Sequence, residues 1–216
     1  MTRVKQHRHD KFRLLDNCLE QPLYLKGKWN QWFPTDQPLY LELGCGKAEL
    51  SVGLATLFPQ RNFLAIDLKS DRLCRGADQA IAKGLSNIGF VRMDILDIAA
   101  YFEPQSIAGI WITFPDPYPR DRDEKKRLTQ KTLLNLYFQL LQSEGDVRMK
   151  SDNDGLMAFT LAEAQQLNLS TDIYTPDLHN SAYLDEQNSL LTRFEQKFLN
   201  GNKNIHYLRL THAGQL

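Results

Sequence analysis

Cysteine is scarce in this chain of 216 residues, and long hydrophobic runs are absent. The three cysteines, Cys18, Cys45 and Cys74, are an odd and widely spaced set without the spacing of metal ligands. This usage argues against a disulfide framework or a metal site and predicts a reduced, cytoplasmic protein. No apolar run approaches the length of a membrane span, and the charged N-terminus lacks the apolar core of a signal peptide. We therefore expect a soluble protein that is not exported and does not bind membranes.

A net charge is also lacking, because 26 cationic and 26 acidic residues give a formal value of +0. This balance argues against a nucleic-acid-binding protein that is cationic over its whole surface. Phosphate contacts act within a Debye length of roughly 8–10 Å, so local basic patches suffice for such binding. One basic patch covers residues 1–13 and another covers residues 120–131. Taken alone, the first patch is typical of a solvated, mobile tail.

Strand-like and helix-like patterns alternate along the chain, whose length and 42% hydrophobic content fit one domain. The expected strands are 39–43, 62–67, 88–93, 107–113, 145–150, 170–175 and 205–211, and the expected helices are 47–58, 70–84, 133–141 and 156–167. This alternation predicts a doubly wound α/β sheet, whose ligands bind beyond the carboxyl ends of the strands. We expect residues 1–36 to form a basic arm and loop extension of a main domain at residues 37–216.

The first expected strand leads into a loop with two glycines, Gly44 and Gly46, which lie between Glu42 and Glu49. Two glycines allow a tight strand-to-helix turn and the close approach of a ligand to the backbone. A dinucleotide site needs a third glycine at position 49, where Glu49 would repel a pyrophosphate. A ligand without phosphate and with a positive sulfonium fits this loop better. We therefore predict S-adenosylmethionine as the cofactor.

Two acids follow successive strands where this cofactor needs them. Asp67 lies about twenty residues beyond the glycines, where a carboxylate accepts hydrogen bonds from both ribose hydroxyls. Asp94 follows the next strand, where it reaches the adenine edge. Either acid alone is common loop chemistry. Their joint placement favours a cofactor site.

The run from Phe114 to Arg127 combines a carboxylate, two aromatic rings and many cations. Its three prolines remove backbone donors and predict that the residues before them are extended. Asp116 then lies at the end of a strand, where it reaches both cofactor and substrate. If the accepting atom is an exocyclic amine, Asp116 accepts its hydrogen bonds. If that atom is guanine N7, no proton has to be removed, and catalysis is mainly alignment.

Cations after Asp116 form the second basic patch and are expected to continue into the first turns of the next helix. The macrodipole favours anions there, so Lys125, Lys126 and Arg127 do not serve helix stability. Phosphate binding explains them better, and a solvated charged face is the alternative.

Two later motifs place polar groups where a core would not require them. Asp152, in the motif Lys150-Ser-Asp-Asn153, joins the acids at the strand ends. Thr192-Arg-Phe-Glu195 has the spacing of a helix capping box, which is how we interpret it from spacing alone.

With these motifs in place, the chain resembles the bacterial tRNA (guanine-N7-)-methyltransferases, the TrmB family, from about residue 27 to residue 198. The specific segments are 114–117 with the following cations, 150–153, 177–181 and 192–195. The resemblance implies a Rossmann-like, class I S-adenosylmethionine-dependent methyltransferase domain at residues 37–216. Its sheet is expected to have seven mostly parallel strands with an antiparallel last strand. The implied reaction is methylation of N7 of the guanosine at position 46, in the variable loop of tRNA, and relatives of the short form imply a homodimer.

The resemblance also implies roles for individual residues. The cofactor positions are Glu42, Gly44, Gly46, Asp67, Asp94 and Asp116, of which Asp116 is also the catalytic residue. The positions for tRNA or its guanine are Arg120, Arg122, Lys125, Lys126, Arg127, Asp152, Thr192, Arg193, Phe194 and Glu195. Arg120 and Asp123 depart from the Lys and His that are usual in the family, and Asp123 lowers the local positive charge.

Other functions stay open at this point. The first is a methyltransferase that acts on an exocyclic amine of a nucleic acid or small molecule. The second is an RNA-binding domain that kept the fold without catalysis. A nicotinamide oxidoreductase is the weakest alternative because of Glu49.

Overall fold

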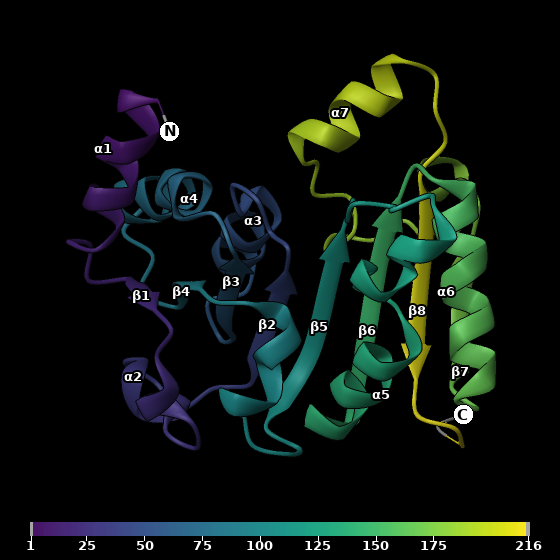
Figure 1. Cartoon of the computed structure of the whole chain (residues 1–216), viewed down its shortest axis with the longest axis horizontal. Coiled ribbons are helices and arrows are strands. Elements are labelled where there is room, and N and C mark those ends of the chain that lie inside the picture. The colour runs from purple at the N-terminus through teal and green to yellow at the C-terminus, as the bar shows by residue number, and fades with distance from the viewer. Residues whose placement is uncertain (1, 215–216) are drawn as a thin grey trace.

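Eight strands form one sheet in the computed structural model, which describes residues 2–214 (Figure 1). They are β1 (Cys18–Glu20), β2 (Leu39–Leu43), β3 (Asn62–Asp67), β4 (Ile88–Arg92), β5 (Ile107–Thr113), β6 (Leu141–Ser151), β7 (Ser170–Thr175) and β8 (His206–Thr211). Their order is β1-β4-β3-β2-β5-β6-β8-β7, and β8 runs antiparallel to both of its neighbours. The strand order reverses between β2 and β5, so the topological switch point lies there. The expected doubly wound sheet with an antiparallel last strand is confirmed.

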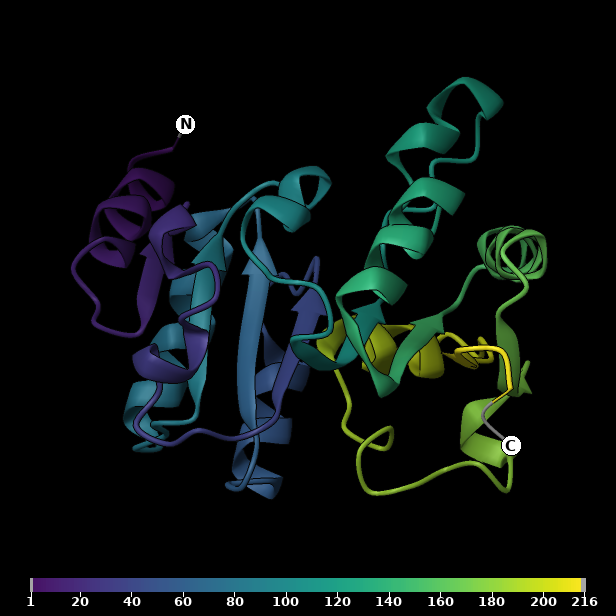
Figure 2. The same ribbon diagram turned by 90° about the horizontal axis from the view of Figure 1, so that it is seen from below.

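Helices lie on both sides of the sheet, and the two ends of the chain lie at its opposite ends (Figure 2). The α-helices are α1 (Arg3–Phe12), α2 (Trp29–Trp32), α3 (Glu49–Leu57), α4 (Ser70–Ala82), α5 (Lys131–Leu140), α6 (Asp154–Gln166) and α7 (Arg193–Asn200). Short 3₁₀ helices are η1 (Leu23–Leu25), η2 (Ile95–Ala100), η3 (Asp121–Lys126) and η4 (Leu178–Asn180).

Two apolar clusters, one on each face of the sheet, form the core. In β5, Ile110 and Ile112 belong to the cluster that includes α5 and α6, whereas Trp111 between them belongs to the cluster with α3 and α4. Successive strand residues point to opposite faces, and both faces are covered here. The central strands are therefore apolar at nearly every position, as expected for a parallel sheet between helices.

The expected count of seven strands is wrong for the described residues, because β1 adds an eighth strand at the edge. It pairs in parallel with β4, with Cys18 opposite Phe90. Three residues without an alternating pattern carry no periodic signal in the sequence. Only the partner strand makes this segment a strand.

The expectation of a mobile tail at residues 1–13 is also wrong where the structure describes that segment. Residues 3–12 form α1, which packs against α4. Phe12 is fully buried, the ammonium group of Lys11 lies 2.5 Å from Asp78, and His9 Nδ1 lies 2.6 Å from Ser70 Oγ. One apolar anchor and two polar contacts therefore fix the helix, while residues 3–7 and Asp10 stay exposed.

No helix within residues 2–214 is long and apolar enough to cross a membrane. Cys18, Cys45 and Cys74 are all buried and free.

Candidate active site at the carboxyl ends of the strands

The loop between β2 and α3 is held by glycine conformation and by Asp67. Gly44 and Gly46 have φ values of +72° and +57°, in the left-handed region that glycine enters without steric cost. Asp67 accepts hydrogen bonds from Gly46 N at 2.9 Å and from Lys69 N at 2.8 Å. Burial raises the pKa of Asp67, and these hydrogen bonds oppose the rise. A Cβ on Gly46 would meet nothing within 4 Å, so open space adjoins this fixed loop.

Glu42, near the end of β2, is buried and braces the same loop from inside the protein. Its Oε2 accepts hydrogen bonds from the backbone N of Ser51, at 3.1 Å, and from the Ser51 hydroxyl. Its Oε1 accepts a hydrogen bond from Thr113 Oγ1 at 2.8 Å. Burial raises the pKa of Glu42, while the hydrogen bonds and the charge of Lys150 oppose that rise. Glu42 thus ties β2 to α3 and β5.

Asp94 follows β4 and lies at the same edge of the sheet as Asp67, because parallel neighbouring strands end together. Its Oδ1 accepts a hydrogen bond from Leu96 N at 3.0 Å and so caps η2. Within residues 2–214 its other carboxylate oxygen accepts no hydrogen bond. That oxygen is free for an external donor.

The loop from Phe114 to Tyr118 is strained at both ends. Phe114 has a φ of +49° and Tyr118 a φ of +41°, which bulky residues rarely adopt. The expectation that the prolines hold these two residues extended is therefore wrong. Phe114 N donates a hydrogen bond to Lys150 O at 2.9 Å, which fixes the start of the loop to β6. Asp116 in its middle is exposed and makes no hydrogen bond or ion pair within the described chain.

Arg127 holds the other end of this loop. Its guanidinium donates hydrogen bonds to the carbonyl oxygens of Pro117 at 3.1 Å and Tyr118 at 2.9 Å. The same group lies 4.2 Å from the ring centroid of Phe159 and 3.3 Å from Glu124. The residue is only 8% exposed. Because its donors are used inside the protein, we correct its expected phosphate contact to positioning of the Asp116 loop.

Asp123 gathers two of the expected tRNA-binding cations. Its carboxylate lies 2.8 Å from Arg120 Nε and 2.6 Å from Lys126 Nζ, and both cationic side chains are more than half exposed. The hydrogen bond from Lys126 lowers the pKa of Asp123. Arg122 and Lys125 are exposed, and neither has an ion pair with another described residue. The cluster therefore presents its charges to solvent.

The expectation that residues 125–127 begin the next helix is wrong. The separate turn η3 ends at Lys126, and α5 begins at Lys131 behind its cap, Gln130. The side chain of Gln130 accepts a hydrogen bond from Thr132 N at 3.0 Å. The exposed cations thus lie on a short turn outside the helix, away from its positive end.

The expected cap at Thr192 is confirmed, but Glu195 has a different partner from that of a capping box. Thr192 Oγ1 accepts a hydrogen bond from Glu195 N at 3.2 Å. The fully buried carboxylate of Glu195 lies 2.6 Å from Lys150 Nζ and 2.9 Å from His179 Nε2. Lys150 also donates to the carbonyl oxygens of residues 188 and 190, each at 3.0 Å. This network fastens the chain before α7, and α7 itself, to the end of β6.

Two further contacts connect α7 to the glycine loop and to the Asp116 loop. Arg193 Nε lies 2.7 Å from Glu49 Oε1, at the start of α3. The rings of Phe198 and Phe114 lie 5.5 Å apart between centroids. Phe194, by contrast, is half exposed. The helix therefore borders the site and presents one half-exposed aromatic ring beside it, with the Arg193 guanidinium 5.7 Å from the ring centroid.

Asp152, after β6, has a partner that the sequence did not reveal. Its Oδ2 lies 2.7 Å from the ammonium group of Lys203. This cation comes from the chain between α7 and β8, and more than half of its side chain is exposed. An exposed pair of this kind separates at little cost. Asp152 is therefore available to a substrate that displaces Lys203.

Sequence reasoning missed the roles of Glu49, Lys150, His179 and Lys203. Lys150 and His179 lie in segments that the sequence analysis singled out, but no local pattern indicated that both pair with Glu195. A lysine at the end of a strand pattern was the one available signal, because lysine is almost never fully buried unless paired.

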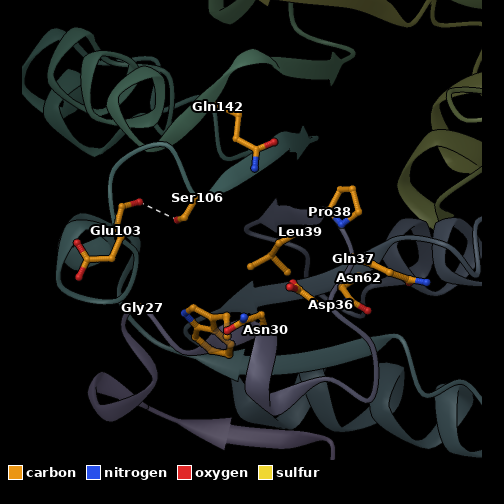
Figure 3. Close-up of a pocket in the computed structure, with 11 residues that line it drawn as sticks. Gly27, Asn30, Asp36, Gln37, Pro38, Leu39, Asn62, Glu103, Ser106 and Gln142 are labelled. Atoms are coloured by element: carbon orange, nitrogen blue, oxygen red, sulfur yellow. Dashed lines mark hydrogen bonds between the residues drawn. The ribbon is translucent and has the colours of Figure 1, made fainter.

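A cavity of about 490 Å³ lies at the opposite edge of the sheet, where the central strands begin (Figure 3). Its lining includes Leu39 and Asn62, where β2 and β3 begin, together with Asp36 and Glu103. The length of a strand, about 17–20 Å, separates it from the acids at the carboxyl ends. We therefore assign the candidate active site to the carboxyl edge.

Comparison with known proteins identifies the family. A family model described as "Putative methyltransferase" matches residues 36–208. The tRNA (guanine-N(7)-)-methyltransferase of Cytophaga hutchinsonii is 40% identical over 186 residues, which cover 85% of this chain and 84% of the relative. The protein of the same name from Bacteroides thetaiotaomicron is 35% identical over 87% of this chain and 74% of its own length.

Solved structures support the fold. An antibiotic-related methyltransferase superposes with a TM-score of 0.62 at 15% identity, over 82% of this chain and 88% of that chain. The 16S rRNA methyltransferase KamB superposes with a TM-score of 0.60 at 12% identity, over 80% and 86%. At such low identity these likenesses show the fold alone. Together with the sequence relatives, they show that the chain belongs to the tRNA (guanine-N7-)-methyltransferase family and has the class I methyltransferase fold.

Proposed function

We propose that this protein transfers a methyl group from S-adenosylmethionine to N7 of a tRNA guanine, the one at position 46 in the variable loop. Family membership supports the reaction class. The observation that carries the site is Asp116, an exposed carboxylate on a strained loop that Arg127 braces. That loop begins at the end of β5, beside the switch point of the sheet, and leads into a turn of exposed cations.

The glycine loop fits the cofactor. Gly46 faces open space, Asp67 lies beside it, and Asp94 keeps one carboxylate oxygen free of internal donors. The carboxylates of Asp67 and Asp94, with a loop whose backbone a ligand can approach closely, suit a ligand that carries ribose hydroxyls, an amino group and a positive sulfonium. When bound there, S-adenosylmethionine supplies an electrophilic methyl group. Glu42 ties β2 to α3 and β5 through its internal hydrogen bonds.

Asp116 is the residue we place at the target base. Guanine N7 exposes a lone pair, so the base gives up no proton when it accepts the methyl group. Methylation leaves a positive charge on the base, and a nearby carboxylate favours that charge. The work of Asp116 is therefore alignment and charge stabilisation. The braced loop suits this role, because it limits the motion of a carboxylate that has no other partner.

The tRNA backbone is assigned to the exposed cations Arg120, Arg122, Lys125 and Lys126, which project from η3 and the residue before it. Asp152 is assigned to the donor edge of guanine, and the exposed ring of Phe194 to stacking on an unpaired base. Thr192 and Glu195 are assigned to fixing the start of α7, because both are buried and used inside the protein.

The test is transfer of a labelled methyl group from S-adenosylmethionine to unmodified bulk tRNA, followed by mapping of the modified atom. We expect N7-methylguanine, which makes the strand selectively cleavable, at one variable-loop position. A methyl group on an exocyclic amine would support the alternative methyltransferase. Tight tRNA binding without transfer would support an RNA-binding domain that lacks catalysis.

Two further assignments rest on the proposed substrate. We propose a cytoplasmic location, which a tRNA substrate supports and which is compatible with three free, buried cysteines. A homodimer is proposed from the family resemblance, and the mass of the protein in solution tests it.

A further inference from the structure

A second group of cations lies near the candidate site, and it comes from elements other than η3. Arg8 of α1, Lys47 of the glycine loop, Arg75 of α4 and Arg193 of α7 make up this group, which we call the α1 surface. Arg193 already belongs to the candidate site. Arg8, Lys47 and Arg75 have no role in the site described above, and none of them has an ion pair with another described residue.

Packing contacts bring these four residues together. Next to Arg75, the helix α4 approaches the glycine loop so closely at Gly76 that an added Cβ would lie 2.7 Å from Lys47 O. Next to Arg8, His9 contacts Ser70 at the start of α4.

The fourth cation joins the group through α3. Arg193 pairs with Glu49, two residues after Lys47. Four separate elements thus place cations around the start of α3.

Electrostatics agree with this arrangement. Burial lowers the pKa of Lys47, and the positive charges of Arg193, Arg75 and Arg8 lower it further, against the opposing charge of Glu49. Glu49 and Asp71, which lies one turn before Arg75 on α4, oppose the four cations, so a local excess of positive charge remains. Such repulsion is unfavourable for the folded protein by itself, so an anion outside the protein is the natural partner.

The position of the α1 surface indicates which anion this is. Helices α1, α4 and α7 all reach the edge of the sheet where the candidate active site lies, with α1 at one side and α7 at the other (Figure 1). The single carboxylate of S-adenosylmethionine would neutralise only one of these charges. A chain of phosphates would neutralise several in a row.

We propose that the α1 surface binds the phosphate backbone of the same tRNA whose guanine enters the active site. This inference rests on the proposed function. It adds a second backbone contact, on the opposite side of the glycine loop from the cations of η3. The N-terminal helix then has a function, because its docking on α4 by Phe12 and Lys11 holds Arg8 in place.

The test removes two charges of the α1 surface that the proposed site does not use. In Arg8→Gln/Arg75→Gln we expect the Kd for tRNA to rise on the order of tenfold at about 0.1 M salt. We expect the slope of log Kd against log salt to fall by about 2, since each phosphate contact contributes about 0.9. The Kd for S-adenosylmethionine should stay within about twofold of wild type, because Gly46, Asp67 and Asp94 are unchanged.

The matched control is Lys28→Gln/Lys83→Gln, which removes two exposed cations that do not belong to the α1 surface. This control should keep the wild-type slope of log Kd against log salt. The variant Arg8→Lys/Arg75→Lys, which keeps both charges, should have most of the wild-type slope. Equal slopes for the glutamine double variant and the control would overturn the inference, as would weakened cofactor binding with unchanged tRNA binding. If the wild-type protein itself transfers no methyl group to tRNA, the proposed function fails, and that result is separate from the slope comparison.

Discussion

The buried pair of Lys150 and Glu195 should be the most sensitive ionic contact in the protein. Both side chains are completely buried, and Lys150 Nζ has three internal acceptors. Burial lowers the pKa of Lys150, while Glu195 opposes that change. Replacing Lys150 with Met removes the cation but keeps a side chain of similar length. The carboxylate of Glu195 then lacks its closest partner inside the protein.

The expected size of this effect follows from the contacts. Breaking a buried ion pair from one side costs about 3–5 kcal/mol, because a charge is left without compensation. Two carbonyl oxygens also lose their donor, and these losses overlap with the first. We therefore expect Lys150→Met to lower the free energy of unfolding by about 3–5 kcal/mol. In Lys150→Met/Glu195→Gln, part of this loss should be recovered, because the unpaired charge is gone.

Urea unfolding of these variants checks the expectation, with Lys203→Met as the control. Lys203 pairs with Asp152 at 2.7 Å, close to the 2.6 Å of the buried pair, but its side chain is 55% exposed. An exposed pair contributes about 0–1 kcal/mol. If Lys150→Met destabilised the protein no more than Lys203→Met, water would reach the pair, and our account of how α7 is held would be refuted.

Three further predictions concern the site itself. Asp67→Ala should raise the Kd for S-adenosylmethionine at least tenfold, because the substitution frees the glycine loop and removes an acceptor for the ribose hydroxyls. An unchanged Kd in calorimetry would contradict this role of Asp67. Arg127→Met should release the strained loop and lower kcat, while the Kd for tRNA changes by less than threefold. A loss of tRNA affinity without a change in kcat would instead indicate that Arg127 contacts a phosphate. Because Lys126 lowers the pKa of Asp123, this acid contributes stability that is present above its ordinary value of 3.8 and is lost as pH falls through the folded value. The difference in urea midpoint between wild type and Asp123→Asn should therefore shrink as pH falls from about 6 to about 3, and a constant difference would exclude this linkage.

Local pattern was sufficient for the central sheet. The strands expected at 62–67, 107–113 and 170–175 have those bounds as β3, β5 and β7. The first two are runs of apolar residues between helices, which a parallel sheet requires. The glycine loop and the acids after β3 and β4 were predictable for the same reason, since strand ends in such a sheet meet at one edge. The family and its reaction class also followed from the sequence motifs, and the comparisons confirm them.

Partners distant in sequence could not be predicted. Glu195 fits the spacing of a capping box, yet it pairs with Lys150, 45 residues away. Arg127 stands in a row of cations that look alike in sequence, and only its contacts with the carbonyl oxygens of the Asp116 loop distinguish it. The helical arm has the composition of a tail, and its docking on α4 depends on the burial of Phe12 and on the contacts of Lys11 and His9. Tertiary contacts decide each of these cases.

We propose that the exposed carboxylate of Asp116 acts on the base during methyl transfer. The direct measurement is the single-turnover rate of methyl transfer to tRNA by Asp116→Asn, with cofactor and tRNA both saturating. Asparagine keeps the shape of the side chain and removes its charge. We predict a rate about 100-fold below wild type, equivalent to about 2.7 kcal/mol in the barrier. A wild-type rate in this variant would contradict the account.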